Sequence, residues 1–214
     1  MYWFYYVARV ITRLLLWLLA RYQVTGIENV PGEGPLLVAA NHLSLADPPI
    51  VGISIGRRVT FMAKEDLFRA RFSGYFMRHS GAFPVRRGGL DRQALKQAEQ
   101  WLARGVAVVV FPEGKRSRNA RLGAAFPGSA LIASRTGAPI LPVGISGTEG
   151  IKGLRWILKR PRIRVNIGRP FLPPGGNPGK AERAQLTDGI MRHIAALLPP
   201  QYRGIYADGS KDED

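Results

Sequence analysis

The chain has 214 residues, no cysteine, and 31 lysine and arginine residues against 15 aspartate and glutamate residues, which gives a formal net charge of +16. The length predicts one domain with a sizeable core, and the lack of thiols excludes disulfides, thiolate metal sites and cysteine nucleophiles. The charge favours an anionic partner such as an acidic membrane surface, nucleic acid or a phosphorylated substrate. A basic surface with no specific partner is the alternative.

Residues 1–24 are predicted to form an amphipathic helix at a membrane interface. The segment is aromatic and aliphatic, but Arg9, Arg13 and Arg21 interrupt it. On a helix these arginines fall within roughly 120° of one another. The uncharged stretches are shorter than the ~20 residues that span a bilayer. We expect the helix to lie in the headgroup layer with its arginines toward lipid phosphates; a helix docked on the protein core is the alternative.

Strand-like and helix-like segments alternate after residue 24. The expected strands cover residues 36–40, 59–63, 82–85, 106–111, 139–145 and 162–167, and the clearest expected helices cover residues 90–104, 128–136 and 180–198. This alternation predicts an α/β fold in which helices flank a layered sheet. Residues 25–204 would form this domain, and residues 205–214 a polar tail.

Charged and polar residues follow three of the predicted strands. Asn41 and His42 end the first, Arg86 and Arg87 another, and residues 112–117 a third. In layered α/β folds, functional groups gather at the carboxyl ends of strands. We therefore expect these three segments to meet in one site.

The spacing of His42 and Asp47 suggests a histidine held by a carboxylate. Asp47 precedes Pro48, a pattern typical of a helix N-cap followed by proline at the first helical position. The loop of residues 43–46 would fold the carboxylate back onto the imidazole, which fixes the tautomer and leaves the other ring nitrogen as a base. The alternative is that Asp47 only caps the helix and His42 only fills space.

No serine offers a convincing nucleophile for this histidine. Ser54 lies in GISIG, the G-x-S-x-G pattern of a nucleophile elbow, but such an elbow needs a strand before it and a helix after it. Here a predicted helix start precedes the serine and a predicted strand follows. His42 is therefore expected to activate a hydroxyl carried by a substrate.

The basic residues at the other two strand ends predict a phosphate site. Arginine side chains hold phosphate oxygens in a bidentate manner, so Arg86, Arg87, Lys115 and Arg116 near His42 indicate a phosphorylated substrate. Glu113 does not fit an anion site, and we expect it to hold an arginine in place or to bond a substrate hydroxyl.

Four blocks in order resemble the glycerolipid acyltransferase family typified by 1-acylglycerol-3-phosphate acyltransferase. The family's Asn-His-x4-Asp block corresponds to residues 41–47, its Gly-apolar-Arg block to GAFPVRR at residues 81–87, its Phe-Pro-Glu-Gly-Thr-Arg-Ser block to residues 111–117, and its apolar-Pro-apolar block to residues 140–143. The resemblance implies a mixed sheet, an N-terminal membrane segment and an acyltransferase domain over residues 25–204.

The resemblance further implies that His42, oriented by Asp47, deprotonates the sn-2 hydroxyl of 1-acylglycerol-3-phosphate, which attacks an acyl thioester to form phosphatidic acid. The residues assigned to substrate binding are Asn41, Arg87, Glu113, Gly114, Lys115 and Arg116. Acyl-CoA or acyl carrier protein would be the cosubstrate, with no metal, other cofactor or nucleic acid. The protein would sit on the cytoplasmic face of the cell membrane, on anionic lipids. Another lysophospholipid, a glycolipid or an amino-lipid is the alternative acceptor.

Two departures from the family pattern bear on the acceptor. Lys115 stands where the family usually has threonine, and residues 125–128 lack the lysine of the family's Phe-Lys-x-Gly. The first change adds positive charge and suits an anionic acceptor, whereas the second leaves the headgroup specificity open.

Overall fold

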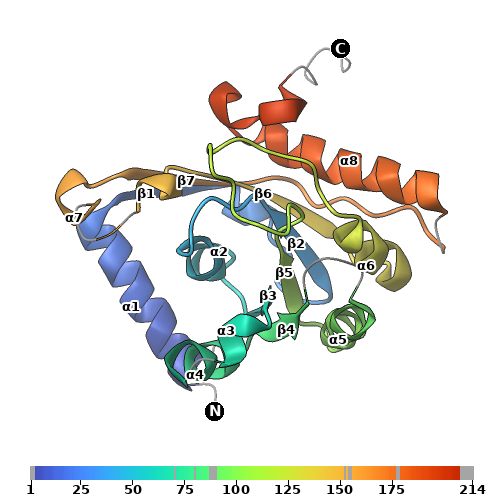
Figure 1. Ribbon diagram of the computed structural model, residues 1–214, viewed down its shortest axis with the longest axis horizontal. Helices are drawn as coiled ribbons and strands as arrows, with labels where there is room; N and C mark the ends of the chain where they lie inside the picture. The colour runs from blue at the N-terminus through green and yellow to red at the C-terminus, as the bar shows by residue number, and fades with distance from the viewer. Residues whose placement is uncertain are drawn as a thin grey trace.

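A computed structural model describes residues 3–69, 71–79, 81–86, 91–151, 153, 156–176 and 179–207. Its centre is a seven-stranded sheet in the order β1-β7-β6-β2-β5-β3-β4 (Figure 1). The strands are β1 (Arg21–Thr25), β2 (Leu36–Ala40), β3 (Val59–Lys64), β4 (Phe83–Val85), β5 (Ala107–Val110), β6 (Ile140–Ser146) and β7 (Arg162–Ile167). β6 and β7 pair antiparallel, and every other neighbouring pair is parallel. The predicted α/β fold with a mixed sheet is thus confirmed.

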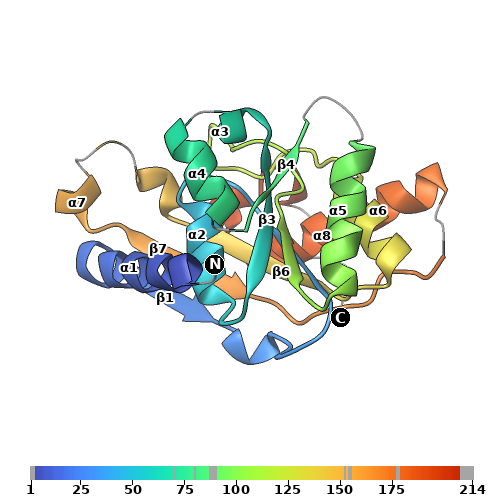
Figure 2. The same cartoon turned by 90° about the horizontal axis from the view of Figure 1, so that it is seen from below.

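Helices cover both faces of the sheet (Figures 1 and 2). The helices are α1 (Trp3–Leu19), α2 (Asp47–Ser54), α3 (Asp66–Arg69), α4 (Arg71–His79), α5 (Arg92–Ala103), α6 (Gly128–Thr136), α7 (Trp156–Lys159) and α8 (Lys180–Ala196). Short 3-10 helices are η1 (Ile27–Asn29), η2 (Thr148–Gly150), η3 (Pro200–Tyr202) and η4 (Gly204–Tyr206). α1 and α2 pack on one face, and α5, α6 and α8 pack on the other.

The apolar runs of the sequence are strands that are buried on both faces. Every residue of β2, β5 and β6 is buried. Alternate residues of β2 serve opposite cores, since Leu37 and Ala39 face α5, α6 and α8 while Leu36 and Val38 face α1 and α2. Strands covered by helices on both sides lose the polar alternation of a half-exposed sheet, which explains why these segments read as continuous apolar runs.

The first predicted helix ends earlier than expected. α1 stops at Leu19, and Arg21–Thr25 form β1, an edge strand in parallel register with β7. In this segment exposed residues alternate with half-buried ones, and Tyr22 and Val24 pack on the core. Pairing with a strand some 140 residues later, Tyr22 opposite Ile163 and Val24 opposite Val165, stabilises the extended form over the helix.

The first residues of the expected polar tail, 205 and 206, belong to a short helix. Residues 204–206 form η4, and Tyr206 packs against the core beside Leu122. The backbone amide of Ile205 donates to the carbonyl of Leu122 at 3.4 Å. Residues 208–214 lie outside the described residues.

None of the described helices combines the length and the apolar content that crossing a membrane requires. α1, with 17 residues, nevertheless presents a broad apolar surface to solvent. Its exposed large side chains in the described part of the helix are Tyr6, Val7, Val10, Ile11, Leu14, Leu15, Trp17 and Leu18.

The topology places the predicted strand ends together. β2, β5, β3 and β4 are neighbours and all run in the same direction, so their carboxyl ends share one edge of the sheet. His42, Arg86 and residues 112–117 follow these ends, as the sequence indicates. Arg87, assigned to substrate binding, lies outside the described residues.

Candidate active site

His42 and Asp47 form the predicted pair. The Nδ1–H group of His42 donates to Oδ2 of Asp47 at 2.8 Å. Asp47 is fully buried, and His42 is 8% exposed. With Nδ1 bound to the carboxylate, the imidazole has its Nε2 free of the proton, which is the tautomer that a general base requires.

Asp47 holds the loop before it and does not cap α2, contrary to expectation. The N-cap is Ala46, and α2 has no side-chain cap. Oδ2 of Asp47 accepts hydrogen bonds from the backbone amides of Leu43 at 2.6 Å and Ser44 at 2.7 Å as well as from His42. A carboxylate that turns back toward upstream amides cannot also reach the amides of the helix that it begins. The one oxygen therefore fixes both the loop and the imidazole ring.

Glu113 positions the backbone of His42. Its Oε1 accepts from the amide of His42 at 3.3 Å, and its Oε2 accepts from the amide of Gly123 at 3.1 Å. Glu113 is 4% exposed, and this burial raises the pKa of its carboxyl against the lowering effect of the two amides. Among the described residues the hydrogen-bond partners of Glu113 are these two amides and not an arginine, whereas its contact with a substrate hydroxyl stays a prediction. Both carboxylate oxygens are used by the scaffold.

The loop after β5 also holds the histidine from its other side. The amide of Ser117 donates to the carbonyl of His42 at 2.7 Å. The imidazole stacks on Phe111, with ring centroids 4.3 Å apart and an interplanar angle of 24°. The two polar segments that follow β2 and β5, residues 41–47 and 111–117, therefore form one unit around His42.

Asn41 ties the site to β6. Its side-chain NH2 donates to the carbonyl of Ile145 at 2.9 Å, and its side-chain oxygen accepts from the amide of Ile145 at 2.7 Å. The residue is 1% exposed. Because both ends of the amide are occupied by the backbone of a neighbouring strand, the geometry does not support the expected contact between Asn41 and the substrate. Because Asn41 directly precedes His42, these two bonds hold the end of β2 against β6.

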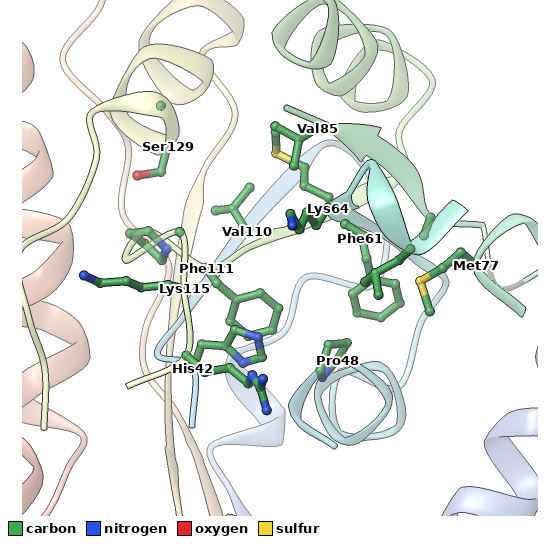
Figure 3. A pocket seen from close by; sticks show the side chains of 18 of the residues that line it. His42, Pro48, Phe61, Lys64, Met77, Val85, Val110, Phe111, Lys115 and Ser129 are labelled. Atoms are coloured by element: carbon green, nitrogen blue, oxygen red, sulfur yellow. The ribbon is translucent and has the colours of Figure 1, made fainter. Parts of the chain in front are cut away.

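A cavity of about 940 Å³ opens beside His42. Figure 3 shows Pro48, Phe61, Val110 and Phe111 around the same space as the histidine. The lining is mainly apolar and comes from both sides of the sheet edge. Further apolar residues that line it are Leu45, Ile53, Met62, Leu67, Met77, Val85, Leu95, Phe126 and Ile132.

Gly114 shapes this cavity with its backbone. Its φ of +64° lies in the left-handed region, and a Cβ there would meet the ring of Phe126 at 2.9 Å. A side chain at this position would strain the turn and push against a cavity wall. The assignment of Gly114 to the site therefore has a steric basis, whereas its contact with a substrate stays a prediction.

Basic side chains gather at the cavity. Lys115 and Arg116 line it and are exposed, and neither forms an ion pair with a carboxylate in the described part of the chain. Arg86 also lines the cavity, but its Nε lies 3.7 Å from a carboxylate oxygen of Asp91. Lys115 and Arg116 are therefore the cations best placed to meet a phosphate.

The cavity is also lined by two basic residues, Lys64 and Arg9, that were not among the predicted site residues. Lys64 ends β3 and pairs with Asp66; its place directly after a predicted strand was the available signal. Arg9 reaches the cavity from α1, next to Ala8 and Thr12. Because Arg9 lines the cavity, the expectation that the arginines of this helix point toward lipid phosphates is wrong for Arg9.

Ser54 takes no part in the site. Its hydroxyl donates to the carbonyl of Ile50 at 2.7 Å and bonds the hydroxyl of Tyr22 at 2.6 Å. It is 1% exposed and links α2 to β1. Among the residues that the structure describes, no group of three or more histidine, aspartate and glutamate side chains is placed to hold a metal ion.

The chain is similar to known acyltransferases. The family model described as "Acyltransferase" matches residues 21–146, more than half of the 214 residues. The 1-acyl-sn-glycerol-3-phosphate acyltransferase of Bacillus subtilis is 28% identical, covering 86% of this chain and 92% of that protein. The chloroplast 1-acyl-sn-glycerol-3-phosphate acyltransferase of Arabidopsis thaliana is 29% identical over 78% of this chain. The chain spans 48% of that plant protein and 50% of the one from Brassica napus, about half their length.

A solved structure agrees with these similarities. The crystal structure of the 1-acyl-sn-glycerophosphate acyltransferase PlsC from Thermotoga maritima matches with a TM-score of 0.70 and 29% identity, covering 87% of this chain and 76% of that one. The matched family region contains the Asp47-held histidine, the Glu113 bridge and the basic loop that follows β5. The chain belongs to the acyltransferase family.

Proposed function

We propose that this protein transfers a fatty acyl group from an acyl thioester to the sn-2 hydroxyl of 1-acylglycerol-3-phosphate, which yields phosphatidic acid. The observation that carries this proposal is the histidine itself, held by Asp47 through Nδ1 and lining a largely apolar cavity with the exposed cations Lys115 and Arg116 beside it. The names of the relatives in bacteria and chloroplasts support the choice of acceptor.

The proposed reaction balances without a covalent enzyme intermediate. Nε2 of His42 takes the proton of the acceptor hydroxyl as its oxygen attacks the thioester carbonyl. The tetrahedral intermediate collapses, the carbon–sulfur bond breaks, and the thiolate takes up the proton from the imidazolium. Asp47 stabilises the imidazolium between the two steps, as in other His–carboxylate pairs.

Lys115 and Arg116 would bind the acceptor phosphate. Both follow the buried Glu113, and backbone bonds fix the loop that carries them: the amide of Gly114 donates to the carbonyl of Phe111 at 2.9 Å, and that of Ser117 to the carbonyl of His42. The two basic residues therefore lie on a loop bonded at both ends to the catalytic unit. Charge-assisted bonds to phosphate would orient the glycerol hydroxyl toward the histidine.

The apolar part of the cavity would hold acyl chains. Burial of each methylene contributes about 0.8 kcal/mol, so a largely apolar cavity of about 940 Å³ provides enough favourable surface to bind long chains. α1 contributes to this space with Ala8 and Thr12, while its opposite side is apolar and exposed. We infer that the exposed side of α1 lies in the interfacial layer of an anionic membrane, where the lipid substrates are.

An acyl-transfer assay tests the proposal. Purified protein would be given palmitoyl-CoA, or the corresponding acyl carrier protein, with 1-acylglycerol-3-phosphate as acceptor, and ester formation would be followed by mass spectrometry. Formation of phosphatidic acid that is lost in His42→Ala supports the proposal. Thiol release with an ester on a glycolipid or an amino-lipid, and none on 1-acylglycerol-3-phosphate, would keep the catalytic unit and replace the acceptor.

A further inference from the structure

We propose that α7 and the arginines beside it form a second contact with anionic lipid, continuous with the exposed apolar face of α1. The inference rests on the proposed seating of α1 at the membrane and adds a contact from a part of the chain more than 130 residues later in sequence. It concerns α7 and the strand pair β1–β7 where α1 ends. Figures 1 and 2 both place α7 at that end of the molecule.

α7 exposes a large apolar side chain, Leu158, which we call the apolar tip of α7. Leu158 is 89% exposed, the highest value among the large apolar side chains of the described residues. Trp156 and Ile157, beside it, are only partly buried. A tryptophan, an isoleucine and an exposed leucine followed by Lys159 are a composition that favours the headgroup–acyl boundary.

One backbone bond joins the segment that follows α7 to the start of β1, two residues after α1 ends. The amide of Arg21 donates to the carbonyl of Pro161 at 2.9 Å, two residues after α7 ends. At the same end, Trp17 and Leu18 of α1 are 72% and 56% exposed. The apolar face of α1 and the apolar tip of α7 therefore belong to one end of the molecule.

Basic residues join these two apolar surfaces. Arg21 of β1 lies opposite Arg162 of β7 in the parallel register, and both side chains are exposed. Like charges directly opposite each other in a sheet destabilise the pairing unless an anion lies between them. Among the described residues, no carboxylate forms an ion pair with Arg21, Lys159 or Arg162. A lipid phosphate would relieve this repulsion.

The combination selects a lipid surface over an acidic protein or a nucleic acid. The positive charge by itself would suit any of these partners. Burial of the exposed Leu158, which lies two residues after Trp156, is favourable against an apolar phase such as the acyl-chain boundary of a bilayer. The two contacts would also prevent the protein from rotating on the membrane about the axis of α1. The side of α1 that lines the cavity, with Ala8 and Thr12, would then stay turned away from the lipid.

The test uses a matched pair of leucine substitutions in the full chain. Leu158→Asp removes the apolar tip, and Leu172→Asp is the control, because Leu172 is 73% exposed but lies next to Phe171, which pairs with Ile140 at the opposite end of β6. Flotation with vesicles of phosphatidylglycerol or phosphatidylcholine would measure partitioning. We expect roughly a ten-fold or greater loss for Leu158→Asp on both lipids, from the transfer free energy of one leucine, and none for Leu172→Asp.

A second variant tests the charged part. The double substitution Arg21→Gln with Arg162→Gln should lower partitioning on phosphatidylglycerol by roughly five-fold per arginine, which corresponds to about 1 kcal/mol per basic residue, and leave phosphatidylcholine binding unchanged. Equal binding of Leu158→Asp and wild type would overturn the inference, as would an equal loss in Leu172→Asp.

The outcomes separate this inference from the proposed function. Wild-type protein that does not float with any vesicle would refute the membrane seating of α1 itself. Wild-type flotation with an unaffected Leu158→Asp variant would refute only the α7 contact. Both variants are expected to retain acyl transfer to acceptor dispersed in detergent, because neither α7 nor the β1–β7 arginines line the cavity.

Discussion

Replacing Asp47 with asparagine separates the charge of the carboxylate from its geometry. Oδ2 of Asp47 accepts all three hydrogen bonds, from Nδ1 of His42 and from the amides of Leu43 and Ser44. Oδ1 is buried and has no partner among the described residues. In Asp47→Asn the amide oxygen can occupy the place of Oδ2 and keep the three bonds, since the reverse orientation would set NH2 against three N–H donors.

The expected loss of activity therefore comes from the missing charge. Hydrogen bonds to a charged group contribute about 1.5–3 kcal/mol against about 0.5–1.5 kcal/mol for neutral pairs. Two unit charges 4 Å apart at an effective dielectric constant of 20 attract by about 4 kcal/mol, which is the upper limit for an imidazolium beside the carboxylate. At 1.36 kcal/mol per factor of ten, kcat should fall between about ten-fold and about a thousand-fold.

Single-turnover acyl transfer with saturating substrates would measure this loss, with Asp47→Ala as the comparison. The alanine variant deprives all three donors of their acceptor and should lose more activity and more stability, about 1–3 kcal/mol for each buried unpaired group. Nitrogen NMR of labelled imidazole would report whether Nδ1 still carries the proton in Asp47→Asn. Loss equal to that of His42→Ala, or a proton moved to Nε2, would refute the claim that the tautomer is kept; an unchanged kcat would refute the role of the charge.

Three further outcomes follow from the site. Asn41→Ala should lower the free energy of unfolding in urea by about 2 kcal/mol, because two buried bonds to Ile145 are lost, and should leave kcat of the folded protein nearly unchanged. Arg116→Ala should raise the KM for 1-acylglycerol-3-phosphate about ten- to a hundred-fold, with little change for the acyl donor and a smaller effect in Arg86→Ala, whose cation is paired. Burial raises the pKa of Glu113 above the ordinary 4.5. Below pH 4.5 the protonated carboxyl stabilises the folded protein, and this contribution is lost as the pH rises through the raised pKa. The free energy of unfolding of the wild type, measured in urea titrations, should therefore exceed that of Glu113→Gln by a smaller amount at pH 7 than at pH 4. A difference that grows over this range would mean that the folded protein favours the ionised carboxyl.

The raised pKa of Glu113 fits its position between two loops. Burial penalises the charge, and the amides of His42 and Gly123 offset only part of that penalty. A carboxylate can accept from both amides at once, whereas glutamine would set an NH2 group against one of them. His42 is thereby held through its backbone as well as through its ring.

The sequence by itself determined the layered α/β fold, six of the seven strands and the His42–Asp47 pair. Residues 36–40 and 139–145 appear as continuous apolar runs in the sequence because strands that are buried on both faces of a sheet carry no polar alternation. The histidine and its carboxylate lie five residues apart, so a short turn suffices to bring them together. Strand ends that share one edge are a consequence of parallel pairing, which the alternation of strands and helices already implies.

Only the tertiary structure decided the roles that depend on distant segments. Asn41 bonds Ile145, Glu113 bonds the amide of His42, and β1 forms by pairing with β7, each across more than 70 residues. Arg9 lines the cavity, and helical periodicity alone does not reveal which side of α1 meets the protein. A polar residue near a site can bind substrate or hold the scaffold, and the choice depends on which backbone groups the fold leaves without partners.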